Sequence, residues 1–343
     1  MNSFGRLFRI SIFGESHGES VGIVVDGCPA GMPLTIDDFL PDLERRKGGT
    51  QKGTTPRQEE DLPIFKSGLF NNKTTGAPIT ILFENKNIRS GDYEKQRDVP
   101  RPGHADFVAH KKFAGFEDFR GSGHFSGRLT VALVAAGVIA KKILLTPFAP
   151  STSGEGIGVR SSILEIGGEK DLDKGLQKAI DSKDSIGGII ECRTVGLPVG
   201  LGEPFFDSAE SLLSHIVFAI PAVRGIEFGT GFAAAKMFGS EHNDAIENME
   251  GKTRTNHAGG IVGGLTNGNE LVFRIAIKPT SSTPKEQVTL NWETGKVEAA
   301  SVKGRHDLCI ALRVPVILEA VTAVVLADLM MLEQRIPKVY PGN

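Results

Sequence analysis

A serine and a histidine stand side by side near the start of the chain, in Phe13–Gly18 (FGESHG). Residues 14–18 match G-x-S-x-G, the pattern in which many hydrolases carry a nucleophilic serine on a strand-to-helix turn. Here the extended pattern of Val21–Asp26 follows instead of a helix, and too few residues precede Ser16 for the strand and loop that complete an oxyanion hole. We therefore interpret the segment as a hairpin loop in which His17 is suited to proton transfer near neutral pH, the alternative being a surface histidine without a role.

Two more histidines lie beside arginines. In Arg101–Asp106 (RPGHAD), a proline and a glycine restrict the backbone before His104, and the guanidinium of Arg101 suits a phosphate or a carboxylate. The triplet Arg305–Asp307 precedes the apolar stretch Val314–Leu332, which favours a rigidly held site. Taken alone, the first cluster is equally typical of a solvated turn, and the second of a weak surface ion pair.

Three further segments favour the binding of anions. Lys278–Ser282 (KPTSS) combines one cation with three hydroxyls at the end of a predicted strand and predicts a phosphate cradle, although it lacks the spacing of a P-loop. Gly259–Gly264 allows close approach of a flat cofactor but lacks the dinucleotide fingerprint. Arg45–Lys47 with Lys52 and Arg57 forms a basic patch of the kind that is usually a solvated face. Together these patterns predict a site for phosphorylated small molecules, with no metal-ligand pair at short spacing.

Hydrophobic periodicity predicts the elements that position these residues. Their mixed order, without regular βαβα alternation, predicts an α+β fold, and we expect a single domain over residues 1–343. The irregular stretch 84–106 is long enough to be functional. The predicted strands cover 6–13, 21–26, 78–83, 187–195 and 271–278, and the predicted helices cover 35–46, 130–145, 172–181, 208–218 and 314–332.

Composition narrows the class of protein. The formal net charge of −2 over 343 residues provides no overall field for nucleic acid or for a membrane surface. The three cysteines are far apart, which favours reduced thiols in a cytoplasmic protein, and the first residues lack the apolar core of a signal peptide. Glu319 and Asp328 interrupt the apolar stretch 314–332, so we expect a buried core helix there and not a membrane span.

Many separate segments, in the same order along the chain, resemble the chorismate synthase family almost from end to end. The resemblance implies an anti-1,4-elimination that converts 5-enolpyruvylshikimate-3-phosphate to chorismate, with reduced FMN required but no net redox change. It also implies a β-α-β sandwich of antiparallel sheets packed around core helices, and a homotetramer. The segments that carry it are FGESHGESVGIVVDGCPAGMPL, RRKGGTQKGTTPRQEED, NIRSGDYEKQRDVPRPGHAD, LVAAGVIAKKIL, GLGEPFFDS, AVRGIEFGTGF, TNHAGGIVGG, KPTSS and KGRHDLC with VPVILEA.

The resemblance also implies roles for matching residues. His17 would protonate or hydrogen-bond the reduced flavin, His104 would be the acid that assists the departing phosphate, and Asp307 would help flavin N5 take the substrate proton. Ser16 would be a substrate or positioning contact. The substrate would be bound by Arg46, Arg128 and Arg305, FMN by His124, Ser126, Ala222, Gly263, Lys278, Pro279, Thr280, Ser281, Ser282 and Arg305, and NADPH, as a possible reductant, by Arg46 and Lys52.

One segment departs from the family. Its GGGRSSARE appears here as GSGHFSGRL over residues 121–129, so His124 replaces an arginine, Phe125 a serine and Leu129 a glutamate. This departure supports an alternative, a non-catalytic relative that binds flavin or phosphate. The sequence also leaves open whether the protein reduces its own flavin with NADPH or depends on an external reductant.

Overall fold

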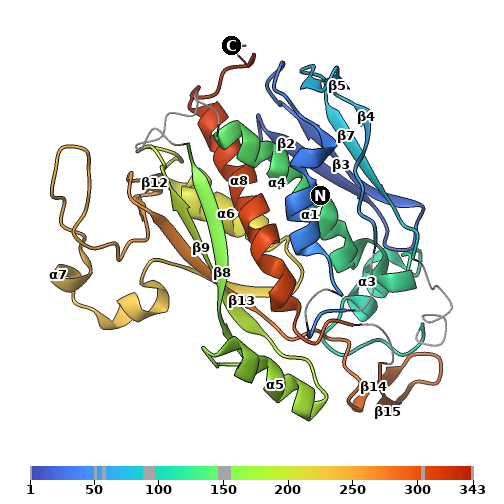
Figure 1. Cartoon of the computed structure of the whole chain (residues 1–343). Coiled ribbons are helices and arrows are strands. Elements are labelled where there is room, and N and C mark those ends of the chain that lie inside the picture. The colour runs from blue at the N-terminus through green and yellow to red at the C-terminus, as the bar shows by residue number, and fades with distance from the viewer. Residues whose placement is uncertain are drawn as a thin grey trace.

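Two antiparallel β-sheets flank a central layer of helices (Figure 1). The computed structural model describes residues 2–49, 52–55, 59–87, 97–145, 156–302 and 306–340. The first sheet packs on helix α4 (Thr130–Leu144), the second packs on helix α8 (Val314–Leu332), and the two helices pack on each other. This arrangement confirms the predicted α+β class and the antiparallel sandwich around core helices.

The first sheet supplies the hairpin that carries His17. Its strands alternate inward apolar side chains with outward ones, and Val21, Ile23 and Val25 are fully buried. Strands β2 and β3 pair in antiparallel register up to Gly14 and Val21, so residues 15–19 form the loop between them. In spatial order the strands are β1 (Ser3–Phe4), β2 (Arg9–Gly14), β3 (Ser20–Asp26), β7 (Ile79–Glu84) and β4 (Ile64–Ser67).

The second sheet ends at the KPTSS turn. Its strand β13 buries Leu271, Phe273, Ile275 and Ile277 at every second position, and the turn follows directly. In spatial order the strands are β10 (Val223–Phe228), β13 (Leu271–Ile277), β9 (Gly188–Val195) and β8 (Gly158–Ile166).

Helices α4 and α8 cross at small residues. A Cβ at Gly137 of α4 would collide with the backbone and Cβ of Ala320, so only glycine permits this approach. Helix α8 is apolar on all sides, and the elements around it bury nearly all of its side chains, as expected of a core helix. The stretch Ile310–Leu332 is long and apolar enough to cross a membrane by length and composition, but it is mostly buried between the sheets.

Two buried carboxylates of α8, Asp328 and Glu319, each accept several hydrogen bonds. Asp328 accepts hydrogen bonds from the backbone N–H groups of residues 6–8, at 2.7–3.1 Å, and so fixes the turn before β2 to the central helix. Glu319 accepts from Arg45, Lys141 and the backbone of Ser161. Charged residues therefore stay in this apolar helix because each has several donors.

Most predicted elements are present with shifted ends, and several elements were not predicted. The predicted helix over 35–46 is a 3₁₀ turn, η1 (Ile36–Asp38), followed by α1 (Leu40–Arg46). Helices α5 (Leu172–Ser182) and α6 (Ala209–Val217) match their predictions. The strands and α-helices that the sequence did not reveal are β1, β4, β8, β10, α3 (Asp106–Phe113), α7 (Gly239–His242), β5 (Leu69–Phe70) with β6 (Lys73–Thr74), β11 (Ile261–Val262) with β12 (Leu265–Thr266), and β14 (Gln287–Asn291) with β15 (Lys296–Ala300).

Candidate active site

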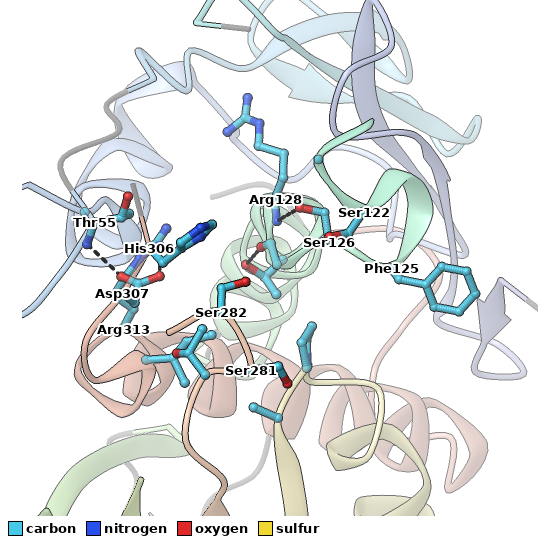
Figure 2. Close-up of a pocket in the computed structure, with 18 of the residues that line it drawn as sticks. Thr55, Ser122, Phe125, Ser126, Arg128, Ser281, Ser282, His306, Asp307 and Arg313 are labelled. Carbon is cyan, nitrogen blue, oxygen red and sulfur yellow. Dashed lines mark hydrogen bonds and ion pairs between the residues drawn. The ribbon is translucent and has the colours of Figure 1, made fainter. Parts of the chain in front are cut away.

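A cavity of about 390 Å³ lies where loops of both sheets meet the start of α8 (Figure 2). Its volume falls in the range of roughly 300–1,000 Å³ that is usual for small-molecule sites. Cationic side chains outnumber acidic ones on its wall, so the cavity favours an anionic ligand. The cationic residues are Arg46, Lys47, Arg101, Arg128, Lys278 and Arg313, and the acidic ones are Glu59, Asp61 and Asp307.

His17 reaches this cavity from the β2–β3 loop. Its side chain is only 6% exposed, and Gly121 must be a glycine because a Cβ there would collide with the imidazole. The loop is fixed from two sides, since Ser16 N donates to the carbonyl of Gly123 at 3.0 Å and Asn85 Nδ2 donates to two loop carbonyls. The imidazole is therefore held in one place, as an acid–base group requires.

Ser16 is not arranged as a hydrolase nucleophile. It lies between two antiparallel strands and not before a helix, and it is fully buried. Its Oγ has no hydrogen-bond partner among the described residues, and Ser16 does not line the cavity. The geometry agrees with the sequence-based rejection of the hydrolase interpretation.

Two arginines on the cavity wall share one carboxylate. Arg46 Nη2 lies 2.6 Å from Asp61 Oδ2, and Arg128 Nη1 contacts Asp61 Oδ1. Arg128 Nε also donates to Asn85 Oδ1 at 3.0 Å, and Arg46 Nη1 donates to Thr130 Oγ1 at 3.2 Å. Burial opposes ionisation of Asp61, but the two arginines outweigh it and hold the pKa of this carboxyl below its usual range. The trio of Arg46, Asp61 and Arg128 therefore carries a net charge of one positive unit, which can bind an anionic ligand.

His104 is the second imidazole on the wall. Its Nδ1 lies 2.6 Å from Asp106 Oδ1, and Arg101 binds both oxygens of that carboxylate at 2.8 Å. Burial opposes ionisation of Asp106, but hydrogen bonds from Arg101 and His104 lower the pKa of its carboxyl well below the usual range. The RPGHAD segment is thus a tightly bonded turn that leads into α3 at Asp106, and not a solvated loop.

His306 and Asp307 form the wall at the start of α8. Asp307 Oδ1 accepts from the backbone N–H of Thr55 at 2.9 Å, and its Oδ2 accepts from Arg313 Nη1 at 3.0 Å (Figure 2). Burial, followed by the charge of Arg101, lowers the pKa of His306 to about 4. His306 is therefore neutral near pH 7, and its buried Nε2 has no hydrogen-bond partner among the described residues.

The KPTSS turn is joined to the RPGHAD segment. Ser281 Oγ accepts from Lys278 Nζ at 2.7 Å and donates to the carbonyl of Gly103 at 2.7 Å. Ser282 Oγ accepts from Arg101 Nη1 at 3.0 Å. Burial, followed by the nearby positive charge of Arg224, lowers the pKa of Lys278. A turn of one sheet and a loop preceding α3 thus form a single surface of donors.

Most of the residues predicted from the sequence meet at this cavity. Those on its wall are His17, Arg46, His104, Ser126, Arg128, Ala222, Lys278, Thr280, Ser281, Ser282 and Asp307.

Other predicted residues lie elsewhere in this chain. Lys52 Nζ contacts Gln177 on α5, and His124 bonds the carbonyl of Gly14 and Asn2 Oδ1. These two, with Gly263 in the β11–β12 turn and Pro279, are not among the residues that line the cavity. Arg305 and Arg57 lie outside the described residues.

Sequence reasoning missed several residues of the wall. Interpreting the basic run as one solvated face was wrong for Arg46, which is 3% exposed. Asp61 was not singled out, because nothing local indicated that it bridges two arginines. His306 and Arg101 stood inside recognised motifs, but their burial and partners could not be deduced from spacing. Arg313 gave no signal in the sequence.

The sandwich carries a cavity that combines excess positive charge with two fixed imidazoles and a third, neutral histidine. These features define an enzyme acting on a small anionic molecule. The model of the chorismate synthase family matches residues 8–331. The chain belongs to the chorismate synthase family.

Individual relatives agree with this assignment. The chain is 69% identical over 340 residues to the chorismate synthase of Chitinophaga pinensis, with 99% of each chain covered. It is 43% identical to that of Dehalococcoides mccartyi, with 98% of this chain and 99% of the relative covered. A crystal structure of chorismate synthase superimposes with a TM-score of 0.71 at 24% identity, covering 96% of this chain and 93% of the other, which shows the same fold.

Proposed function

We propose that the protein catalyses the reaction of its family, the anti-1,4-elimination of phosphate from 5-enolpyruvylshikimate-3-phosphate to give chorismate, as a carbon–oxygen lyase. The observation that carries this proposal is the meeting of His17 and His104 with the Arg46–Asp61–Arg128 trio around one cavity. The substrate has two carboxylates and a phosphate, and the wall offers more cations than acids to receive them. Fixed donors of this kind stabilise charge that develops on a leaving group.

In this proposal the two histidines have separate tasks. His104 carries a proton on its imidazole and gives it to the departing phosphate as the carbon–oxygen bond breaks. His17, fixed against Gly121, holds or donates a proton toward the cofactor. Asp307, oriented by Thr55 and Arg313, keeps a carboxylate at the cavity where it can assist removal of the substrate proton.

We infer that the cofactor is FMN, because the chain's residues fit it. Thr280 Oγ1 and His306 Nε2 are buried without hydrogen-bond partners among the described residues, and both line the cavity. Ile310, Val314 and Ile317 add an apolar wall suited to a flat ring. Reduced FMN, when bound, would supply the electron-rich ring that the family's elimination requires without net redox change. Lys278, Thr280, Ser281, Ser282, Ser126 and Ala222 would hold it.

The source of reducing equivalents stays a prediction. Arg46 and Lys52 were assigned to NADPH by resemblance, but Arg46 is bound to Asp61 and Lys52 contacts Gln177. An aerobic assay with NADPH as the only reductant tests this assignment. Turnover would support a built-in flavin reductase activity, and dependence on dithionite or an added reductase would contradict it.

We further propose a homotetramer of single-domain chains in the cytoplasm. The segment around α7 extends away from the body of the protein (Figure 1), and it exposes Phe232, Phe238, Ile246 and Met249, the last of these at 97%. Apolar side chains on such an arm are suited to contact other copies of the chain. Light scattering after gel filtration should give the mass of four chains. The three free, buried cysteines agree with a reducing compartment.

The activity is tested with purified protein, FMN, dithionite and the phosphorylated substrate under anaerobic conditions. We expect stoichiometric release of phosphate and formation of chorismate. Tight binding of FMN without turnover would instead favour the non-catalytic relative.

Substitution of the histidines tests their roles. His17→Ala and His104→Ala should each lower kcat by about a hundredfold or more, as expected when acid–base assistance is lost, while circular dichroism shows an intact fold. Wild-type turnover in either variant would contradict the role given to that histidine.

A further inference from the structure

The imidazole of His104 is bonded at both nitrogens by residues that the proposed reaction leaves without a role. Asp106 Oδ1 lies 2.6 Å from Nδ1, and Ser122 Oγ lies 3.3 Å from Nε2. Arg101 contacts both partners, donating from Nη2 to Asp106 Oδ1 at 2.8 Å and to Ser122 Oγ at 2.9 Å. One guanidinium therefore joins the two groups that border the ring.

These contacts determine the tautomer of the neutral imidazole. Asp106 is ionised and can only accept, so the proton of the neutral ring lies on Nδ1. Arg101 has no acceptor, so Ser122 Oγ must accept from it and is free to donate its own O–H to Nε2. The Nη2 of Arg101 also lies 3.1 Å from Nδ1, but both atoms are then donors and the contact is not a hydrogen bond.

Ser122 takes an uncommon backbone conformation at this point. Its φ is +71°, in the left-handed region that non-glycine residues rarely enter, and glycines stand on both sides of it. Strain of this kind persists where the surroundings require it, and it concentrates at functional sites. Ser122 also lines the cavity. In this conformation the Ser122 hydroxyl points at His104, a contact that a glycine at position 122 could not make.

We propose that Asp106, Arg101 and Ser122 form a positioning set that fixes the imidazole of His104, with Nδ1 bound to Asp106 and Nε2 presented to the cavity beside the Ser122 hydroxyl. The proposal rests on the proposed function, because it assumes that His104 is the acid for the leaving phosphate. In the cationic form Nε2–H is the proton that is transferred. After transfer, the Nε2 lone pair accepts from Ser122, which keeps the ring in place for reprotonation by solvent.

Asp106→Asn removes the charged partner while keeping its size. We expect kcat to fall by about tenfold to a hundredfold, as is usual when the group that orients a functional histidine is lost, with KM changed by less than about threefold. The matched control is Glu191→Gln, since Glu191 is also a carboxylate bound by arginines, Arg193 at 2.7 Å and Arg274 at 2.8 Å, but has no hydrogen bond to a histidine among the described residues. The control should lose stability and keep kcat within about twofold. An unchanged kcat in Asp106→Asn would overturn the proposal.

Ser122→Gly and Ser122→Ala separate the hydroxyl from the backbone strain. Both lose the hydroxyl, but only glycine relieves the positive φ, so Ser122→Gly should have the higher Tm of the two. We expect kcat to be lowered about equally in both, by several-fold to tenfold. If kcat instead follows Tm, or is unchanged in both variants, Ser122 has no positioning role.

The tautomer can be read without turnover. In ¹⁵N spectra of histidine-labelled protein above neutral pH, with His104 assigned by comparison with His104→Ala, the wild type should show a protonated Nδ1 and an unprotonated Nε2. The opposite tautomer would overturn the proposal directly. If His104→Ala retains full activity, the role of His104 itself fails, whereas an inactive His104→Ala with normal Asp106 and Ser122 variants contradicts only the positioning set.

Discussion

Two consecutive arginines at the end of α1 enter two ion clusters of opposite design, a partly exposed one around Glu319 and a buried one around Asp61. Arg45 points toward Glu319 of α8 and donates to both oxygens of its carboxylate, at 2.7 and 2.8 Å. Lys141 Nζ donates to the same carboxylate at 2.9 Å. Asp42 completes this cluster with bonds to Arg45 and Lys141, so two cations meet two carboxylates. The core cluster is therefore neutral, and it ties α1, α4 and α8 together.

The cluster of Arg46 is left positive. Asp61 is shared by Arg46 and Arg128, which leaves one positive charge, whereas the Arg313 guanidinium at the carbonyl of Arg46 is paired with Asp307. Arg46 Nε is buried without a hydrogen-bond partner among the described residues. Buried charge without full compensation costs stability, so its presence on a cavity wall indicates a ligand that supplies the missing negative charge. The neutral cluster around Glu319 therefore stabilises the fold, whereas the positive cluster around Asp61 is suited to bind an anionic substrate.

The largest expected effect comes from the positive cluster. Arg46→Met keeps the length of the side chain and removes the charge, so we expect kcat/KM to fall by about a thousandfold, equivalent to about 4 kcal/mol of lost transition-state stabilisation. Steady-state kinetics measures this loss. Urea unfolding should change little, because a repulsion between cations disappears together with the bond to Asp61. Arg45→Met is the control and should leave kcat/KM within about twofold.

The neutral cluster should respond in the opposite way. Glu319→Gln leaves the partly exposed Arg45 and Lys141 facing a buried amide, so we expect the free energy of unfolding to fall by about 2–3 kcal/mol. Urea titration measures this change, while kcat at 25 °C should remain near that of the wild type. A large loss of kcat without a loss of stability would contradict the division into two clusters.

The smallest effect concerns the pH dependence of stability. Because the pKa of His306 is lowered to about 4 in the folded protein, the unfolded chain, with a value of about 6.5, binds the extra proton between these pH values. The free energy of unfolding should therefore fall as the pH is lowered from 6.5 to 4, by on the order of 1–3 kcal/mol.

His306→Gln isolates this contribution. The variant should show a shallower dependence between pH 6.5 and 4, and the two curves should run parallel above pH 7, where His306 is neutral in both states. Urea titrations at a series of pH values measure the slopes. Parallel curves over the whole range would show that His306 is not held neutral by its surroundings.

The sequence predicted the elements with strong periodicity, and it failed where partners are distant. The apolar helix 314–332 and the strand 271–278 were identifiable because their own residues define a buried face. Strand β8 was missed because polarity does not follow its alternating burial: Ser161 and Glu165 are half-buried, whereas Leu164 is exposed. Helix α3 was missed because it starts inside a motif rich in proline and glycine.

For the site, the sequence supplied residue types but not their partners. His17, His104 and the KPTSS turn stood out because their chemistry is local. The sharing of Asp61 between Arg46 and Arg128 depends on contacts 15 and 67 residues apart along the chain, which no local pattern encodes. The roles toward FMN came from family resemblance and remain proposals.

The place of α8 at the centre of the sandwich has a consequence for biosynthesis. This helix leaves the ribosome after every strand that it packs against, since it spans residues 314–332 and packs on strands of the second sheet, the first of which begins at Gly158. Until then the inner face of the second sheet and the side of α4 that packs on α8 have no partner, and contacts this distant in sequence form slowly. We expect the nascent chain to expose apolar surface for most of its synthesis, and therefore to depend on chaperones more than a protein whose core closes domain by domain.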